Sequence, residues 1–168
     1  MRYSPVALAL SLMVAVSSSV IHSAPGTSLD PKAAALVAHG RAELAAGRID
    51  PALDAFESAL VISPGSAPIL IGLAEAQRAQ GLQGKALHYY REALEADPRN
   101  LVAIAGEGEA LAEKGALEKA RRNLARLKGL CGAECREARD LAALIERAPA
   151  QRIVSAEAAR PAPVVSDN

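Results

Sequence analysis

The sequence predicts an all-α protein, an antiparallel helix-pair solenoid of about three repeats with a C-terminal capping helix. Alanine, the residue with the highest helix propensity, fills 38 of the 168 positions. Only four residues are aromatic and none is tryptophan, which argues against a strand-rich sandwich. Small and apolar residues recur at one constant spacing of about 34 residues, which indicates stacked helical repeats.

The first 23 residues have the composition of a secretory signal peptide. Arg2 is the only charged residue before Asp30, an apolar stretch runs from Val6 to Val16, and small residues follow up to Ala24. The alternative is an uncleaved membrane anchor, but the apolar stretch is shorter than the roughly 20 residues that a spanning helix needs. We expect cleavage near residue 23, a linker over residues 24–31, and no membrane insertion afterwards.

Composition and cysteine content point to the bacterial periplasm. Arg outnumbers Lys 14 to 5, as is common in proteins from GC-rich bacterial genomes. Cys131 and Cys135 are the only cysteines, and in an oxidising compartment such a pair is most simply a disulfide. Free buried thiols and a metal or redox site are the alternatives. A zinc site would lack obvious further ligands, because His39 and His88 lie far away in the sequence.

An alanine, an aromatic residue, a second alanine and a proline form the most regular part of the repeat. Each recurs at the same spacing, in the pairs Ala52 and Ala86, Phe56 and Tyr90, Ala59 and Ala93, and Pro64 and Pro98. Gly47, Gly81 and Gly115 share this period, and a third copy continues in phase through Ala120 and Leu124.

This pattern resembles the tetratricopeptide repeat (TPR) family. The resemblance covers residues 33–134, as repeats 33–66, 67–100 and 101–134 within an array that spans residues 32–148. The first copy departs from the pattern with His39 and Glu43 at usually apolar positions. The third departs further, with Glu107, Leu127 and Gly132 in place of an apolar residue, a small residue and proline. Such departures are expected in terminal repeats.

Local signals place the helices independently of that resemblance. Asp30-Pro31 and Asp50-Pro51 each offer an N-cap carboxylate before a proline, and Ser66 and Asn100 are candidate caps for the later repeats. The three periodic glycines fall where the first helix of each repeat must end. We expect Phe56 and Tyr90 to fill the gaps between successive repeats and His39 to pack in or near the core.

A last helix is expected over residues 134–147, where it would cover the open face of the third repeat. Its apolar positions are Ala138, Leu141, Ala142, Leu144 and Ile145. Residues 149–168 are rich in alanine and proline and lack a periodic pattern, so we expect a disordered tail.

The sequence points to a binding protein and not to an enzyme. No nucleophile turn, paired carboxylates or glycine-rich phosphate loop is present, so we expect no catalytic residues, no cofactor and no metal. The net charge of zero argues against a nucleic-acid partner. The one dense basic run, Lys119, Arg121, Arg122, Arg126 and Lys128, is interpreted as a solvated face, with an acidic partner or anionic lipid as the alternative.

The family resemblance implies a concave groove formed by the first helix of each repeat. The implied groove residues are Val37, Arg41, Leu44, Ile71, Glu75, Arg78, Val102, Ala105, Glu109 and Glu113. Val37, Ile71 and Ala105 share one repeat position and are expected to form an exposed apolar strip. The Lys and Asn with which some members grip a C-terminal carboxylate are absent, so that ligand is not expected.

We therefore predict a non-enzymatic periplasmic scaffold or adaptor that binds a protein or peptide segment in this groove. The alternatives are a structural accessory subunit or assembly factor of an envelope, secretion or pilus complex, and an array that associates with itself. The sequence leaves the partner's identity and the oligomeric state open.

Overall fold

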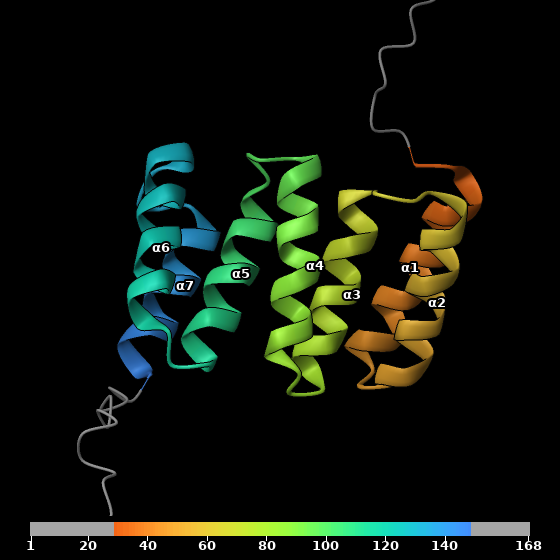
Figure 1. The fold of residues 1–168 in the computed structure, drawn as a ribbon, viewed down its shortest axis with the longest axis horizontal. Coiled ribbons are helices and arrows are strands. Elements are labelled where there is room, and N and C mark those ends of the chain that lie inside the picture. Colours follow the sequence, from red (N-terminus) through yellow and green to blue (C-terminus); the bar gives the residue numbers. More distant parts are fainter. Residues whose placement is uncertain (1–28, 149–168) are drawn as a thin grey trace, which may run out of the picture.

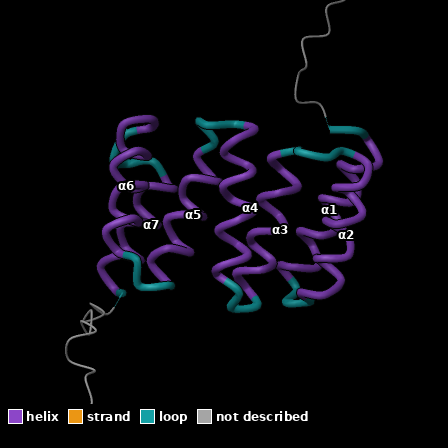
Figure 2. The backbone as a smooth tube through the Cα atoms, in the orientation of Figure 1, coloured by secondary structure: helices purple, strands orange, loops and turns teal. Residues whose placement is uncertain are grey.

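The computed structural model describes residues 29–148, and every regular element in that part of the chain is a helix (Figures 1 and 2). The helices are α1 (Pro31–Ala45), α2 (Ile49–Ile62), α3 (Ala67–Ala79), α4 (Gln83–Ala96), α5 (Leu101–Glu113), α6 (Leu117–Cys131) and α7 (Arg136–Arg147). The all-α solenoid prediction is confirmed. The expected signal peptide, most of the linker and the C-terminal tail lie outside the described residues.

Helices α1 to α6 form three antiparallel pairs that stack side by side (Figure 1). Helix α1 also contacts α3, α3 contacts α5, and α5 contacts α7, so these four helices share one face of the solenoid. Helix α7 takes the place that the first helix of a fourth repeat would have. Ala138 and Leu141, both fully buried, follow Ile104 and Glu107 by one repeat period.

Most of the predicted helix boundaries follow from local capping. The Asp30 carboxylate accepts a hydrogen bond from the Lys32 amide at 2.8 Å, and the Asn100 side chain accepts one from the Ala103 amide at 3.1 Å. Gly47, Gly81 and Gly115 adopt φ values of 74°, 77° and 80°, a region that favours glycine, and each ends the first helix of its repeat.

Two of the predicted caps behave differently. Helix α2 begins one residue before Asp50, so this carboxylate lies in the first turn and accepts a hydrogen bond from the Gln80 side chain at 3.0 Å. Ser66 occupies the N-cap position of α3, but its side chain makes no capping hydrogen bond. Asp50 thus connects the first repeat to the second and does not cap a helix.

Successive repeats meet through an aromatic ring that packs on a glycine. Phe56 is fully buried, and a Cβ added to Gly72 of the next repeat would lie 2.4 Å from its Cε1 atom. The same joint recurs one repeat later, where a Cβ on Gly106 would lie 2.3 Å from the Cζ atom of Tyr90. The prediction that Phe56 and Tyr90 fill these gaps is confirmed.

The third joint is built from aliphatic side chains. Leu124 and Asp140 stand where the earlier joints have the aromatic residue and the glycine. Buried Leu127 and Leu141 fill this joint instead, and a Cβ on Gly108 would lie 2.5 Å from a Leu141 methyl group. Helix α7 therefore packs tightly against α5 and α6.

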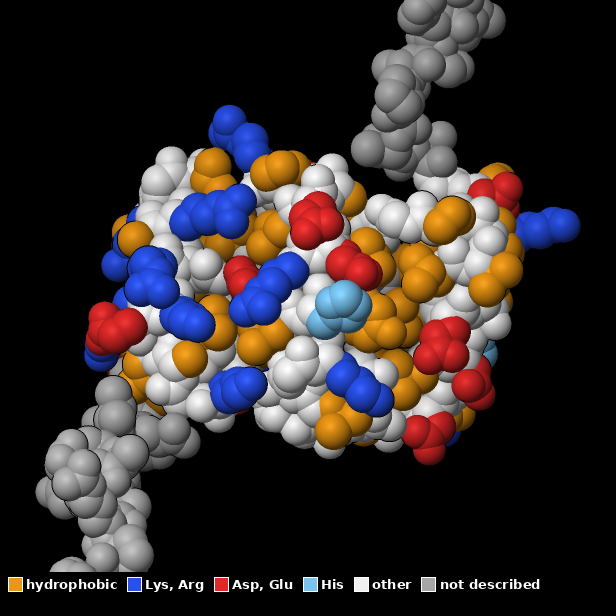
Figure 3. Space-filling model, viewed as in Figure 1, with side chains coloured by type: hydrophobic (Ala, Val, Ile, Leu, Met, Phe, Trp, Pro, Cys, Tyr) orange, Lys and Arg blue, Asp and Glu red, His pale blue; other side chains and the backbone are white. Residues whose placement is uncertain are grey.

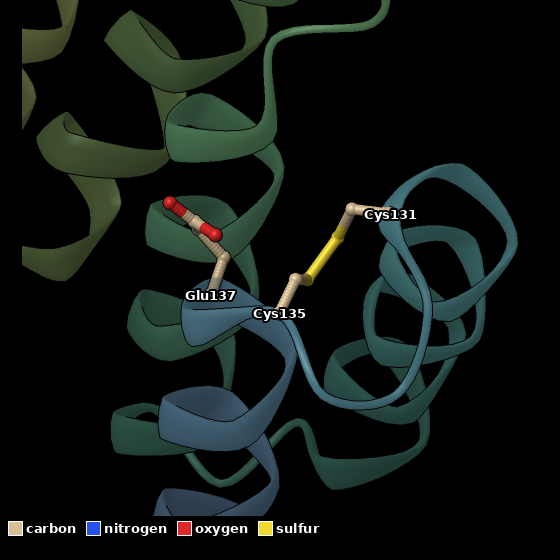
Figure 4. A group of neighbouring side chains, drawn as sticks. All are labelled: Cys131, Cys135 and Glu137. Carbon is tan, nitrogen blue, oxygen red and sulfur yellow. A yellow bond between two sulfur atoms is a disulfide. The ribbon is translucent and has the colours of Figure 1, made fainter.

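A disulfide between Cys131 and Cys135 spans the turn from α6 to α7, with Cα atoms 5.8 Å apart (Figure 4). Helix α7 begins directly after Cys135, so the bridge fixes its N-terminus against the end of α6.

The expectation that His39 packs in or near the core is wrong, because its side chain is 60% exposed and lies near the carboxylate of Glu43. No helix in residues 29–148 has the length and apolar character to cross a membrane.

Candidate functional site

The candidate site lies on the groove face, which we define as the face formed by α1, α3, α5 and α7. All ten sequence-predicted residues belong to α1, α3 and α5. Three of them are exposed, namely Arg41, Val102 and Glu113. Four are half-buried, namely Leu44, Glu75, Arg78 and Glu109, and three are buried, namely Val37, Ile71 and Ala105.

The expected exposed apolar strip does not exist. Val37, Ile71 and Ala105 are only 4%, 5% and 6% exposed, and each belongs to a hydrophobic core cluster. The reason is close helix approach, because Gly72 and Gly106 let the first helix of one repeat settle onto the repeat before it. The three residues therefore stabilise the stack and are not an open floor for a ligand.

The charged residues of the predicted set do come together. Arg78 on α3 forms ion pairs with two carboxylates of α5, Glu109 and Glu113, the latter with 3.1 Å between Nε and Oε1. Arg41 on α1 is close enough to Glu75 to favour its ionised form. The site is thus a charged network that crosses three neighbouring helices.

Glu75 is a half-buried carboxylate on α3. Burial raises its pKa above the ordinary value, and the positive charges of Arg41 and Arg78 counteract only part of this rise. Glu109 adds to it because it carries a like charge. Burial also raises the pKa of the Tyr90 hydroxyl, so that group stays protonated at neutral pH.

These groups surround a pocket of about 320 Å³ between α3, α5 and α7, which we call the central pocket. Its walls are Glu75, Arg78, Tyr90, Val102, Ala105, Gly106, Glu109, Arg136, Glu137 and Asp140. A second recess of about 450 Å³ shares Glu75, Arg78 and Glu109 with it and extends towards Leu44 of α1 and Glu113. The two cavities therefore lie next to each other on the groove face.

Sequence reasoning missed five residues of the central pocket, namely Tyr90, Gly106 and three residues of α7. Tyr90 belongs to α4, but its ring passes over Gly106 and brings the hydroxyl to the pocket wall. The tyrosine in place of Phe56 was a usable signal, since a hydroxyl at a buried position needs a polar surrounding. Arg136, Glu137 and Asp140 come from α7, which the sequence identified only as a cap. The sequence signal for these three residues was that α7 continues the repeat period of α5, as the first helix of a further repeat would.

The described residues form recesses elsewhere too, such as one of about 520 Å³ whose lining includes Arg91, Lys114 and Lys119. Cys131, Cys135 and Glu137 lie close together, but both sulfur atoms are used in the disulfide and cannot also serve as thiolate ligands (Figure 4). Lys and Arg side chains gather over the α6 end of the molecule (Figure 3). There Arg121 pairs with Glu118, and Arg126 donates to the carbonyl of Pro98.

Comparisons with solved structures show that the chain has the fold of TPR domains. It matches the first TPR of Spaghetti (RPAP3) bound to an HSP90 peptide, SRMEEVD, with a TM-score of 0.62 and 19% identity over 68% of this chain and 94% of that one. The Sgt2 TPR domain from Aspergillus fumigatus gives 0.61 and 23% identity over 85% and 93%.

A third match is the Yersinia enterocolitica type III secretion chaperone SycD in complex with a peptide of the translocator YopD. Its TM-score is 0.58, with 21% identity over 67% of this chain and 86% of that one. No family model matches the sequence, and no curated protein does.

Proposed function

We propose that this chain is a non-enzymatic scaffold that binds a protein or peptide segment along its groove face. The central pocket carries the proposal, because it is a recess on that face lined by ionisable groups, a hydroxyl and the exposed apolar side chain of Val102. Polar groups that converge beside apolar surface are typical of binding sites. Two of the solved structures with this fold hold peptides, one from HSP90 and one from YopD.

We further propose that the protein acts in the periplasm. The support is the signal-like composition of residues 1–23 together with a disulfide of the kind that oxidising compartments favour. Fractionation of cells that express the full chain, followed by N-terminal sequencing, tests this. We expect a periplasmic product that begins near residue 24. An intact N-terminus in the cytoplasm would contradict the proposal.

A peptide selection tests the binding function. The full chain is immobilised and presented with a random dodecapeptide library, and the affinity of each selected peptide is then measured by fluorescence anisotropy. We expect Val102→Asn to weaken binding about tenfold, because it replaces the apolar side chain at the rim of the central pocket with a polar, uncharged one.

Val61→Asn is the matched control, since Val61 is 85% exposed at the end of α2 and lines neither the central pocket nor the second recess. We expect it to bind within twofold of the wild type. Both variants must keep the wild-type circular dichroism spectrum. A library without binders, or equal losses in the two variants, would refute a binding function of the groove face.

A further inference from the structure

The central pocket has more negative than positive groups. Four carboxylates line it, those of Glu75, Glu109, Glu137 and Asp140, against the guanidinium groups of Arg78 and Arg136. Both guanidinium groups are already engaged. Arg78 pairs with Glu109, and Arg136 pairs with Asp140, with 3.5 Å between Nε and Oδ2.

Two carboxylates of the pocket form no ion pair within the described part of the chain, although the charges of Arg41 and Arg78 act on one of them, Glu75, from farther away. Neither Glu75 nor Glu137 forms an ion pair or a hydrogen bond among residues 29–148. Both are half-buried, and they reach the pocket from opposite walls, α3 and α7. A carboxylate that has lost part of its water is stabilised by a cation that takes the water's place.

A third polar group faces the same space. Tyr90 is 1% exposed, yet its hydroxyl reaches the pocket wall between Arg78 and Gly106. A phenol oxygen can accept a hydrogen bond from an ammonium or guanidinium group. The exposed side chain of Val102 offers apolar surface at the rim for the methylene groups of a long side chain.

We propose that the central pocket receives a Lys or Arg side chain of the bound segment, with Glu75 and Glu137 as its ionic partners and the Tyr90 hydroxyl as a further acceptor. This inference rests on the proposed function and specifies the chemistry of its ligand. An acidic segment would meet the two carboxylates without an ion pair, Glu75 and Glu137, so like-charge repulsion disfavours it. The HSP90 peptide SRMEEVD has two Glu and one Asp against a single Arg, so its net charge is negative and it should bind more weakly than the selected peptides.

Replacement of Glu75 and Glu137 by glutamine tests the proposal. The probes are the selected dodecapeptides and synthetic SRMEEVD, titrated into the full chain by fluorescence anisotropy at several salt concentrations. We expect the selected peptides to share a Lys or Arg that cannot be replaced by norleucine without at least tenfold weaker binding. We expect Glu75→Gln/Glu137→Gln to weaken binding by a similar factor and to lower its salt dependence.

The two changes should also be coupled. In the doubly substituted protein the norleucine exchange should have little further effect, because both changes remove the same contact. The matched control is Glu57→Gln/Glu95→Gln, which makes the same charge change at exposed positions of α2 and α4. It should bind within twofold of the wild type. Thermal melts check that all variants are folded.

The possible failures can be told apart. If the selected peptides bind equally well after norleucine replaces their Lys or Arg, but their binding still depends on Val102, then the cationic ligand is overturned and the proposed function remains intact. The absence of any binding peptide would overturn both. A third outcome is that light scattering detects salt-sensitive self-association and that Glu75→Gln/Glu137→Gln abolishes it. The basic α6 face of a second copy would then fill the pocket, and this would also overturn the proposal.

Discussion

Substitution of Gly106 by alanine is expected to destabilise the joint between the second and third repeats by about 2 kcal/mol. The new Cβ would lie 2.3 Å from the Cζ atom of Tyr90 and 2.6 Å from its hydroxyl oxygen, about an ångström inside ordinary contact. The ring is 1% exposed and cannot move aside without shifting α4 against α5. Overpacking of this kind costs roughly 1–3 kcal/mol, and the size of the overlap places it near the upper end.

Part of this destabilisation is offset because Gly106 lies inside a helix. Alanine in place of glycine inside a helix gains about 1 kcal/mol, so the net loss is about 2 kcal/mol. Gly129→Ala isolates this gain, because Gly129 lies within α6 and a Cβ there meets nothing within 4 Å. Urea unfolding followed by far-UV circular dichroism measures both variants. If Gly106→Ala were as stable as the wild type, or gained stability as Gly129→Ala should, the aromatic–glycine joint would be refuted.

Three further predictions concern stability. Gln77 is 7% exposed with an unsatisfied Oε1, and Leu111 fills the same repeat position, so Gln77→Leu should raise the free energy of unfolding by about 1 kcal/mol; an unchanged or lower melting temperature would contradict this. Burial raises the pKa of Glu75 above its ordinary value of 4.5, so just above pH 4.5 the folded state binds more protons than the unfolded state, and the free energy of unfolding should fall as pH rises through this window. Urea titrations across pH should show a weaker fall for Glu75→Gln than for the wild type, and identical pH slopes would contradict the prediction. Reduction of the Cys131–Cys135 bridge should cost about 2 kcal/mol of loop-closure stabilisation, seen as a modest drop in melting temperature; two titratable thiols in the unreduced, denatured protein would disprove the bridge.

The parts of the fold that depend on neighbouring residues could be predicted from the sequence. The caps at Asp30 and Asn100 and the three turn glycines act within a few residues, so their local patterns placed the helix ends. The repeat period then predicted the stacking, because each repeat buries its apolar face against the next. The aromatic residues of the first two joints, Phe56 and Tyr90, were identified from the same period.

The groove could be predicted only in part, because it depends on how closely the repeats approach. The register placed Ile71 on the groove side, but the glycine beside it lets the helices close over its side chain. Ile71→Glu is therefore expected to unfold the protein and is unsuited to test ligand binding. The α7 wall of the central pocket depends on tertiary packing, which single-helix patterns do not describe.

The central claim is that the face formed by α1, α3, α5 and α7 binds a segment of another protein. The most direct test is a series of ¹⁵N–¹H correlation spectra of the full chain during titration with a selected dodecapeptide. The claim predicts that the largest amide shift changes fall in α3, in α5 and in the first turn of α7, around the central pocket. Changes confined to α2 and α6 would place the binding surface on the opposite side and contradict the claim.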